Sequence, residues 1–179
     1  MNDEVVHGIP GSRRLQPGDV VGVDLGAQID GFHGDGAITF CVGAPSTEAE
    51  RLMEVTKGAL MKGIKQARAG NKLSDISRAI QSWVEKAGYS VVRDLVGHGI
   101  GREIHEPPQV PNVVIDGPSL VLKTGMTLAI EPMVNIGDWK IRREADGWTY
   151  RTKDGSLSAH FEHTVAITEK GPEILTSED

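Results

Sequence analysis

Residues 19–26, Asp19-Val20-Val21-Gly22-Val23-Asp24-Leu25-Gly26, alternate between apolar side chains and small or acidic ones. A period of two is typical of a β-strand that buries one face. We therefore expect Val21, Val23 and Leu25 to face the core and Asp24 to lie on the opposite face. Asp30-Gly31 predicts a tight turn, and residues 37–42 match a returning strand. Residues 19–42 are thus predicted to form a β-hairpin.

Two amphipathic helices are predicted after the hairpin. Residues 47–50 fit a capping box, and apolar residues recur behind it at helical spacing until Gly70. A second helix is predicted from Ser74 to Ala87, with Gly88 as its terminator. Both helices carry one apolar face, so both are expected to pack on a sheet.

The second half of the chain is predicted to be mainly strands. A short strand at 89–93 precedes a Gly/Pro-rich loop from Gly97 to Pro118. Further strands are expected at 126–134, 139–143, 148–152, 159–168 and 173–175. Helices in the middle of the chain with hairpins on both sides predict a single α+β domain spanning residues 1–179.

Composition excludes several classes of protein. The chain has 179 residues, 39% of them hydrophobic, and a formal net charge of −6, which disfavours a DNA-binding protein. It contains no apolar run long enough to span a membrane and no secretory signal at its start. The one cysteine cannot form an internal disulfide, so a cytoplasmic location is expected.

Three predicted strands carry an acid among small side chains. Asp24, Glu131 and Glu162 share their strand faces with Gly, Ala or Thr, which leaves space around each carboxylate. The hairpin can bring Asp35 close to Asp24, and glycines flank His98. Solvent-facing acids and a structural histidine are the alternative interpretation. If the five converge, their oxygen-rich set suits two divalent ions better than one structural zinc.

Seven further segments, spread over essentially the whole chain, are informative in combination with these five residues. They are Val6–Pro10, Asp30–Asp35, Gly97–Arg102, His105–Val110, Ile130–Met133, Asp146–Thr149 and Ser156–Thr164. In this order they resemble a known superfamily, the dinuclear "pita-bread" peptidases and, within it, the type I methionine aminopeptidases.

The resemblance implies a hydrolase that removes the N-terminal methionine of nascent proteins when the second residue is small. It implies that Asp24, Asp35, His98, Glu131 and Glu162 bind two divalent ions of cobalt, manganese, iron or zinc. A hydroxide held by the ions would attack the peptide carbon. By the same resemblance Glu131 would carry the proton to the leaving amine, while His105 would stabilise the oxyanion. His7 would contact the peptide, and Trp148 would line the methionine pocket.

The chain also departs from the family's pattern. The family domain normally begins before the position of Met1, so we expect a pita-bread fold that is truncated at its N-terminus. His160 stands where glutamine is usual, and Ile104 where an aromatic residue is usual; both are expected to affect substrate fit and not metal binding. A peptide or nascent-protein N-terminus is the expected partner, with the ribosome as a weaker candidate. Family members are monomers, and truncation would allow an oligomer. The alternatives are an inactive fragment or binding module of the same fold, and an Xaa-Pro-type peptidase.

Overall fold

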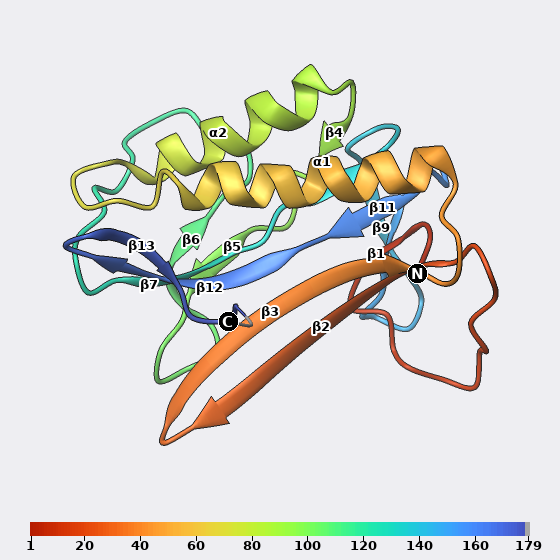
Figure 1. Cartoon of the computed structure of the whole chain (residues 1–179), viewed down its shortest axis with the longest axis horizontal. Coiled ribbons are helices and arrows are strands. Elements are labelled where there is room, and N and C mark those ends of the chain that lie inside the picture. Colours follow the sequence, from red (N-terminus) through yellow and green to blue (C-terminus); the bar gives the residue numbers. More distant parts are fainter. Residues whose placement is uncertain (178–179) are drawn as a thin grey trace.

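A curved antiparallel sheet with two helices on one face forms the architecture of the computed structural model, which describes residues 1–177 (Figure 1). The main sheet has the strand order β2-β3-β12-β7-β5-β6, with β13 paired to β12. Two three-stranded sheets, β11-β8-β4 and β1-β10-β9, adjoin it. The strands are β1 (Glu4–Val6), β2 (Val20–Ile29), β3 (Phe32–Cys41), β4 (Ser90–Val91), β5 (Gly97–Gly99), β6 (Glu106–Val110), β7 (Thr127–Ile130), β8 (Met133–Asn135), β9 (Ile141–Arg143), β10 (Tyr150–Thr152), β11 (Ser158–His160), β12 (Glu162–Thr168) and β13 (Gly171–Ile174).

Both predicted helices form, although the first ends earlier than predicted. Helix α1 spans Thr47–Ile64 and helix α2 spans Leu73–Lys86. The N-cap of α1 is Ser46, one residue before the predicted box, because its hydroxyl accepts a hydrogen bond from the Ala49 amide at 3.1 Å. The helix also ends well before Gly70, and the chain continues from Ile64 in turns.

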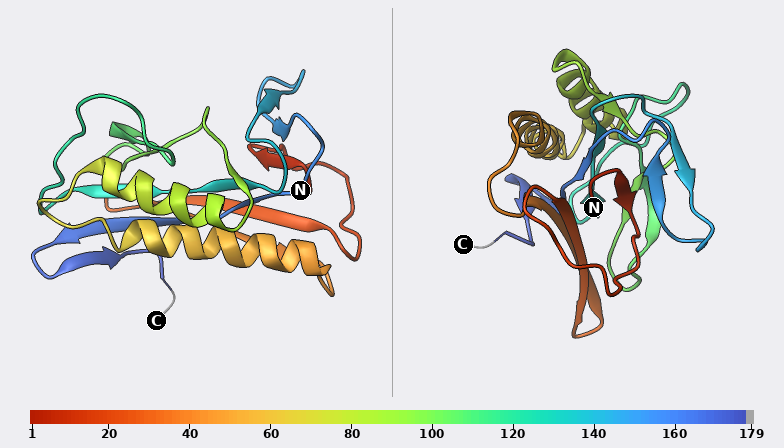
Figure 2. Two further views of the ribbon diagram at one scale, coloured as in Figure 1. Left: turned by 90° about the horizontal axis from the view of Figure 1, so that it is seen from above. Right: turned by 90° about the vertical axis from the view of Figure 1, so that its right-hand side faces the viewer.

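The core lies between the two helices and the sheet. The helices run beside each other over the strands (Figure 2), and their apolar stripes meet the sheet through fully buried side chains such as Leu52 and Ile80. Leu128, Ile130 and Val165 supply the sheet side of this core. The α+β class predicted from the order of elements is therefore confirmed.

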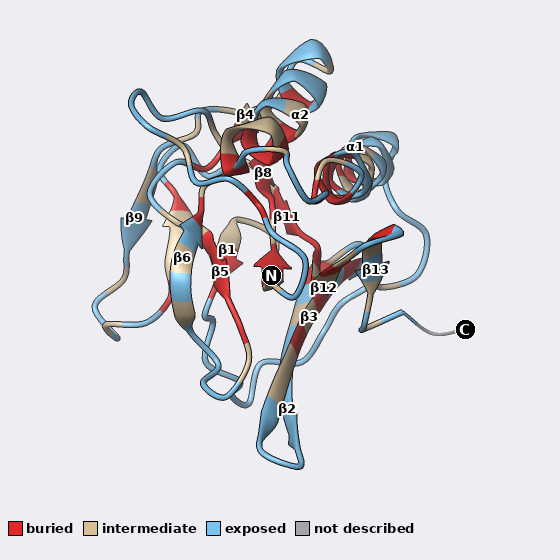
Figure 3. Cartoon of the chain, turned by 90° about the vertical axis from the view of Figure 1, so that its left-hand side faces the viewer, coloured by how far each residue is buried: buried red, intermediate tan, exposed pale blue. Residues whose placement is uncertain are grey.

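The predicted hairpin forms β2 and β3, with Ile29 paired to Phe32 across the turn. One part of the prediction is wrong: Leu25 is 70% exposed, although its alternation with Asp24 predicted burial. Figure 3 shows that the outer part of the hairpin projects away from the core and is largely exposed. Period two identifies two faces of a strand, but only the rest of the fold decides whether either face is covered.

The predicted loop at 97–118 is also corrected, because it contains β5 and β6. Likewise, the predicted strand at 126–134 is two strands, interrupted at Glu131-Pro132, and the one at 159–168 is interrupted at Phe161. Proline lacks an amide hydrogen, which accounts for the first break. Within the described residues, no helix is long and apolar enough to cross a membrane.

Candidate metal centre

Three of the five predicted ligands come together from three strands. Asp35 lies in β3, His98 in β5 and Glu162 at the start of β12, and one potential ligand atom of each lies within 4.8 Å of the others. All three residues are buried, with 8%, 9% and 2% of their surfaces exposed. Burial of two carboxylates beside an imidazole is costly unless a cation or protons compensate the charge.

Glu131 reaches the same centre from the break between β7 and β8. Its Oε1 lies 3.4 Å from His98 Nε2, and this nitrogen is 4.0 Å from Asp35 Oδ2. The backbone carbonyl of Glu131 accepts a hydrogen bond from the Asn112 side chain at 3.1 Å, which holds the break in place. Asp24 lies on the same hairpin face as Asp35, because Gly26 is the residue paired with Asp35. It is the exposed member of the set.

The glycines beside His98 allow two neighbouring strands to approach it. A Cβ on Gly97 would lie 2.3 Å from the Ala129 carbonyl oxygen, and one on Gly99 would lie 2.3 Å from the Pro107 oxygen. Nδ1 of His98 lies 2.9 Å from the carbonyl oxygen of Gly99, which can only accept a hydrogen bond. Nδ1 therefore carries the proton, and Nε2 directs its lone pair toward the carboxylates.

The electrostatics of the centre are those of an uncompensated acidic cluster. Burial, reinforced by the charges of Glu131, Asp35 and Asp24, raises the pKa of Glu162 to about 10. Partial burial of its carboxylate and the charges of Asp35 and Glu131 also raise the pKa of Asp24, although His160 opposes the shift. Both shifts favour the neutral acids, so a nearby cation would relieve an unfavourable arrangement.

The residues present fit divalent metal ions. Oε1 of Glu162 is buried and has no hydrogen-bond partner among the described residues, so it remains available as a ligand atom. Around it are three further carboxylates and an imidazole whose free nitrogen faces them. This mixture of oxygen donors with one nitrogen suits manganese, iron, cobalt or zinc.

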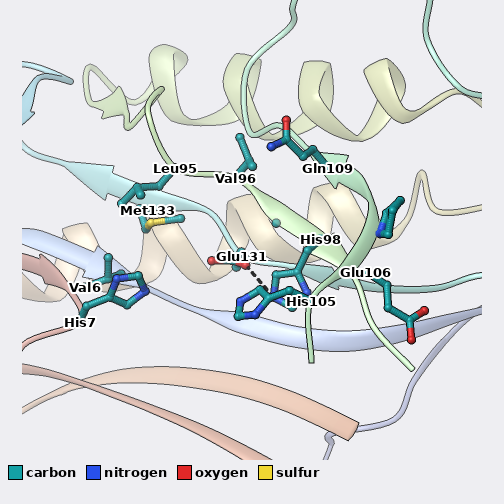
Figure 4. A pocket seen from close by; sticks show the side chains of 12 residues that line it. Val6, His7, Leu95, Val96, His98, His105, Glu106, Gln109, Glu131 and Met133 are labelled. Carbon is teal, nitrogen blue, oxygen red and sulfur yellow. Dashed lines mark ion pairs between the residues drawn. The ribbon is translucent and has the colours of Figure 1, made fainter. Parts of the chain in front are cut away.

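A cavity of about 430 Å³ opens beside the centre (Figure 4). Glu131 and His98 lie on one side of it, and its apolar wall consists of Val6, Leu95, Val96 and Met133. Two further predicted residues, His7 and His105, also line the cavity. The ring of His105 lies 4.3 Å from that of His98, and the His7 ring lies edge-on to Tyr150 at 6.0 Å.

Trp148 lies elsewhere: it is not among the residues lining this cavity, and it is 62% exposed. Its predicted role in a methionine pocket stays a prediction. Ile104 packs over the hairpin, since a Cβ on Gly26 would lie 2.9 Å from its Cδ1.

His160 has a role in the centre that sequence reasoning missed. It was expected to affect substrate fit and not metal binding, yet its Nε2 lies 3.6 Å from Oε2 of Glu131, a predicted metal ligand. This nitrogen is buried and has no hydrogen-bond partner within residues 1–177. Its position two residues before Glu162 is the signal that could have placed it here, because alternate strand residues share a face.

Comparison with known proteins links this geometry to a family. The family model described as "Metallopeptidase family M24" matches residues 1–169 of this chain. The methionine aminopeptidase of Clostridium perfringens is 54% identical over 176 residues, covering 98% of this chain and 71% of that protein. Methionine aminopeptidase 1 of Bacillus subtilis is 52% identical, with the same two coverages.

Solved structures of a methionine aminopeptidase and of a prolidase share the fold of this chain. The methionine aminopeptidase of Thermotoga maritima superposes with a TM-score of 0.95 at 52% identity, covering 99% of this chain and 72% of that one. The prolidase of Pyrococcus horikoshii superposes with a TM-score of 0.79 at 25% identity, covering 99% of this chain but 45% of the prolidase.

Proposed function

The chain belongs to metallopeptidase family M24, among its methionine aminopeptidases, and from this membership we propose how its residues remove an N-terminal methionine. An aminopeptidase acts on the N-termini of peptides or proteins. The finer proposal is that the second residue must be small and that two divalent ions take part, drawn from cobalt, manganese, iron and zinc. The likeness to curated methionine aminopeptidases at 46–54% identity favours this substrate over the Xaa-Pro alternative, whose solved relatives are 25–28% identical.

The observation that carries the proposal is the buried Oε1 of Glu162, which lies in an acidic cluster and has no hydrogen-bond partner within the part of the chain that the structure describes. Asp24, Asp35, His98, Glu131 and Glu162 would hold the ions. Such ions, when bound, polarise the scissile carbonyl and lower the pKa of water toward neutrality. The remaining tasks fall to side chains of the chain itself.

Glu131 is the proposed proton carrier. Its carboxylate lies between two imidazoles, with one oxygen 3.4 Å from His98 and the other 3.6 Å from His160. A carboxylate at the edge of the cavity can accept a proton from the attacking water and donate it to the departing amine.

The cavity provides the proposed substrate contacts. His105, beside His98, can donate a hydrogen bond to the carbonyl oxygen as negative charge develops there. His7 is placed to contact the peptide, since it lines the same cavity. The apolar wall formed by Val6, Leu95, Val96 and Met133 is suited to an unbranched thioether side chain.

The test is the rate of methionine release from a Met-Ala-Ser peptide with added Mn(II) or Co(II). Glu131→Gln removes the charge at nearly constant volume, and Glu173→Gln changes an exposed glutamate in β13 as the matched control. We expect turnover in the wild type and the control, and its loss in Glu131→Gln. Wild-type protein that binds metal without turnover would support the alternative of an inactive fragment.

A further inference from the structure

Two threonine hydroxyls connect β3 to the strands that carry Glu162 and His160. At the first connection the Asp35 amide donates to Thr164 Oγ1 at 2.8 Å, and the same hydroxyl donates to the Asp35 carbonyl, also at 2.8 Å. One side chain thus satisfies both backbone groups of Asp35 on that edge. Thr164 is 1% exposed, so water does not replace these bonds.

At the second connection the side chain comes from β3 and the backbone groups come from the other strand. The Thr39 hydroxyl donates to the His160 carbonyl at 2.6 Å and accepts from the His160 amide at 3.0 Å. Thr39 is also buried, at 6% exposure. Here a side chain of β3 holds the backbone of β11, whereas Thr164 of β12 holds the backbone of β3.

The two connections are symmetric about one residue pair. Glu162 pairs with Ala37 in the antiparallel register of β12 and β3. Continuing that register by two residues places Thr164 opposite Asp35 in one direction and His160 opposite Thr39 in the other. In a regular antiparallel ladder, two backbone hydrogen bonds would join each of these residue pairs. Here a threonine hydroxyl makes the two bonds in place of its own backbone groups.

The backbone of Thr164 is not free to make this pair itself. Its amide donates to Thr176 Oγ1 at 3.1 Å, and its carbonyl accepts from the Leu175 amide at 2.9 Å. The β12 edge therefore changes its hydrogen-bonding partner near this point. Residues 162 and 163 pair with β3, whereas the backbone of Thr164 bonds to residues 175 and 176. A side chain that both donates and accepts is required to keep Asp35 attached.

We propose that Thr164 and Thr39 are positioning residues that hold β3 against β12 and β11 and so preform the metal centre. This inference rests on the metal centre proposed above. Only two residue pairs, Ala37–Glu162 and Gly36–His163, join β3 to β12 directly. Direct pairing therefore covers only a short stretch of the two strands, and the two hydroxyl connections extend the attachment of β3 on both sides of it.

The experiment compares hydroxyl-deleting and hydroxyl-retaining variants of the full chain. Thr164→Val and Thr39→Val keep the side-chain shape, while Thr164→Ser and Thr39→Ser keep the hydroxyl. Thr56→Val is the control, because Thr56 is a fully buried threonine in α1 whose hydroxyl donates to the Leu52 carbonyl at 2.7 Å. Calorimetric titration of metal-free protein with Co(II) gives the dissociation constant, and the visible absorption of bound Co(II) reports ligand geometry.

We expect each valine variant to bind Co(II) roughly 10- to 100-fold more weakly, as for other groups that orient metal ligands, with an altered spectrum. The serine variants and Thr56→Val should match the wild type. Wild-type affinity and spectrum in both valine variants would overturn the inference, even if their melting temperatures fell. Absence of Co(II) binding by the wild type would instead overturn the proposed metal centre itself.

Amide hydrogen exchange on metal-free wild type tests the same idea without a variant. The amides of Asp35 and His160 should exchange slowly before any metal is added, because each donates to a threonine hydroxyl. Exchange of both at the rate of an unprotected amide until metal is added would contradict a preformed centre.

Discussion

Nε2 of His160 lies 3.6 Å from Oε2 of Glu131, on the side of that carboxylate away from His98. Glu131 is therefore flanked by two imidazoles, and the His160 ring is buried with 4% of its surface exposed. An N–H at Nε2 of His160 can attract the Glu131 carboxylate electrostatically at this distance. A small shortening of the distance would convert the contact into a charge-assisted hydrogen bond.

The His160 contact predicts an effect on turnover. His160→Ala should lower kcat/KM by roughly tenfold, because removal of a partner that orients a ligand typically costs 10- to 100-fold. His160→Gln should retain most activity, since its amide can still donate to Glu131. Steady-state kinetics on Met-Ala-Ser would decide, and wild-type kinetics in the alanine variant would show that the contact is dispensable.

Removal of metal should destabilise the protein. If two ions bind only the folded chain, each present at a thousandfold its Kd adds about 4 kcal/mol to the free energy of unfolding. Thermal unfolding with EDTA should therefore occur at a lower temperature, and added Mn(II) should restore the original value. A melting temperature indifferent to EDTA would argue against bound ions.

The raised pKa of Glu162 predicts how the metal-free protein responds to pH. The pKa is about 10 in the folded chain and has an ordinary value of 4.5. Between these two pH values the folded state therefore holds a proton that the unfolded state releases. The contribution of Glu162 to the free energy of unfolding is fully present below pH 4.5 and falls as the pH rises toward 10. The raised pKa of Asp24 acts in the same direction.

Urea unfolding of EDTA-treated protein at about pH 6 and about pH 9 measures this dependence. Stability should be lower at the higher pH, and Glu162→Gln should reduce the difference because glutamine does not titrate. An unchanged pH dependence in the variant would exclude Glu162 as the source. Metal binding should release a proton, so affinity should rise with pH.

Gly97 should not tolerate a side chain. A Cβ there would lie 2.3 Å from the backbone oxygen of Ala129. Gly97→Ala should therefore cost at least about 2 kcal/mol, because β5 must move away from β7. Gly11→Ala is the control, since a Cβ at Gly11 meets no atom within 4 Å. Equal urea midpoints for the two variants would contradict the expected clash.

Leu25 should tolerate a polar replacement despite its place in an alternating strand. It is 70% exposed, so Leu25→Lys should change the free energy of unfolding by no more than about 0.5 kcal/mol. Leu128→Ala, at a fully buried position, should cost about 2–5 kcal/mol. Denaturant melts of both variants test this ranking; a large loss in Leu25→Lys would mean that its face is covered in solution.

Much of the fold could be predicted because its signals are local. Alternation and the Asp30-Gly31 turn placed the hairpin of β2 and β3, and helical periodicity placed α1 and α2 to within a few residues of their starts. Strands β5 and β6 were not predicted, since their pairing depends on the backbones of β7 and of each other and not on a pattern of their own.

The sequence by itself determined that Asp24 in β2 and Glu162 in β12 share their strand faces with small residues, because side-chain direction in a strand follows from position alone. It also placed Glu131 directly after the residues that form β7. Only the tertiary structure decided that His98 pairs with Ala129, that Glu162 pairs with Ala37, and that His160 and two threonine hydroxyls border the same centre. It also decided that Leu25 lies outside the core. These facts depend on pairing between distant segments, and such pairing is set by the packing of the whole chain.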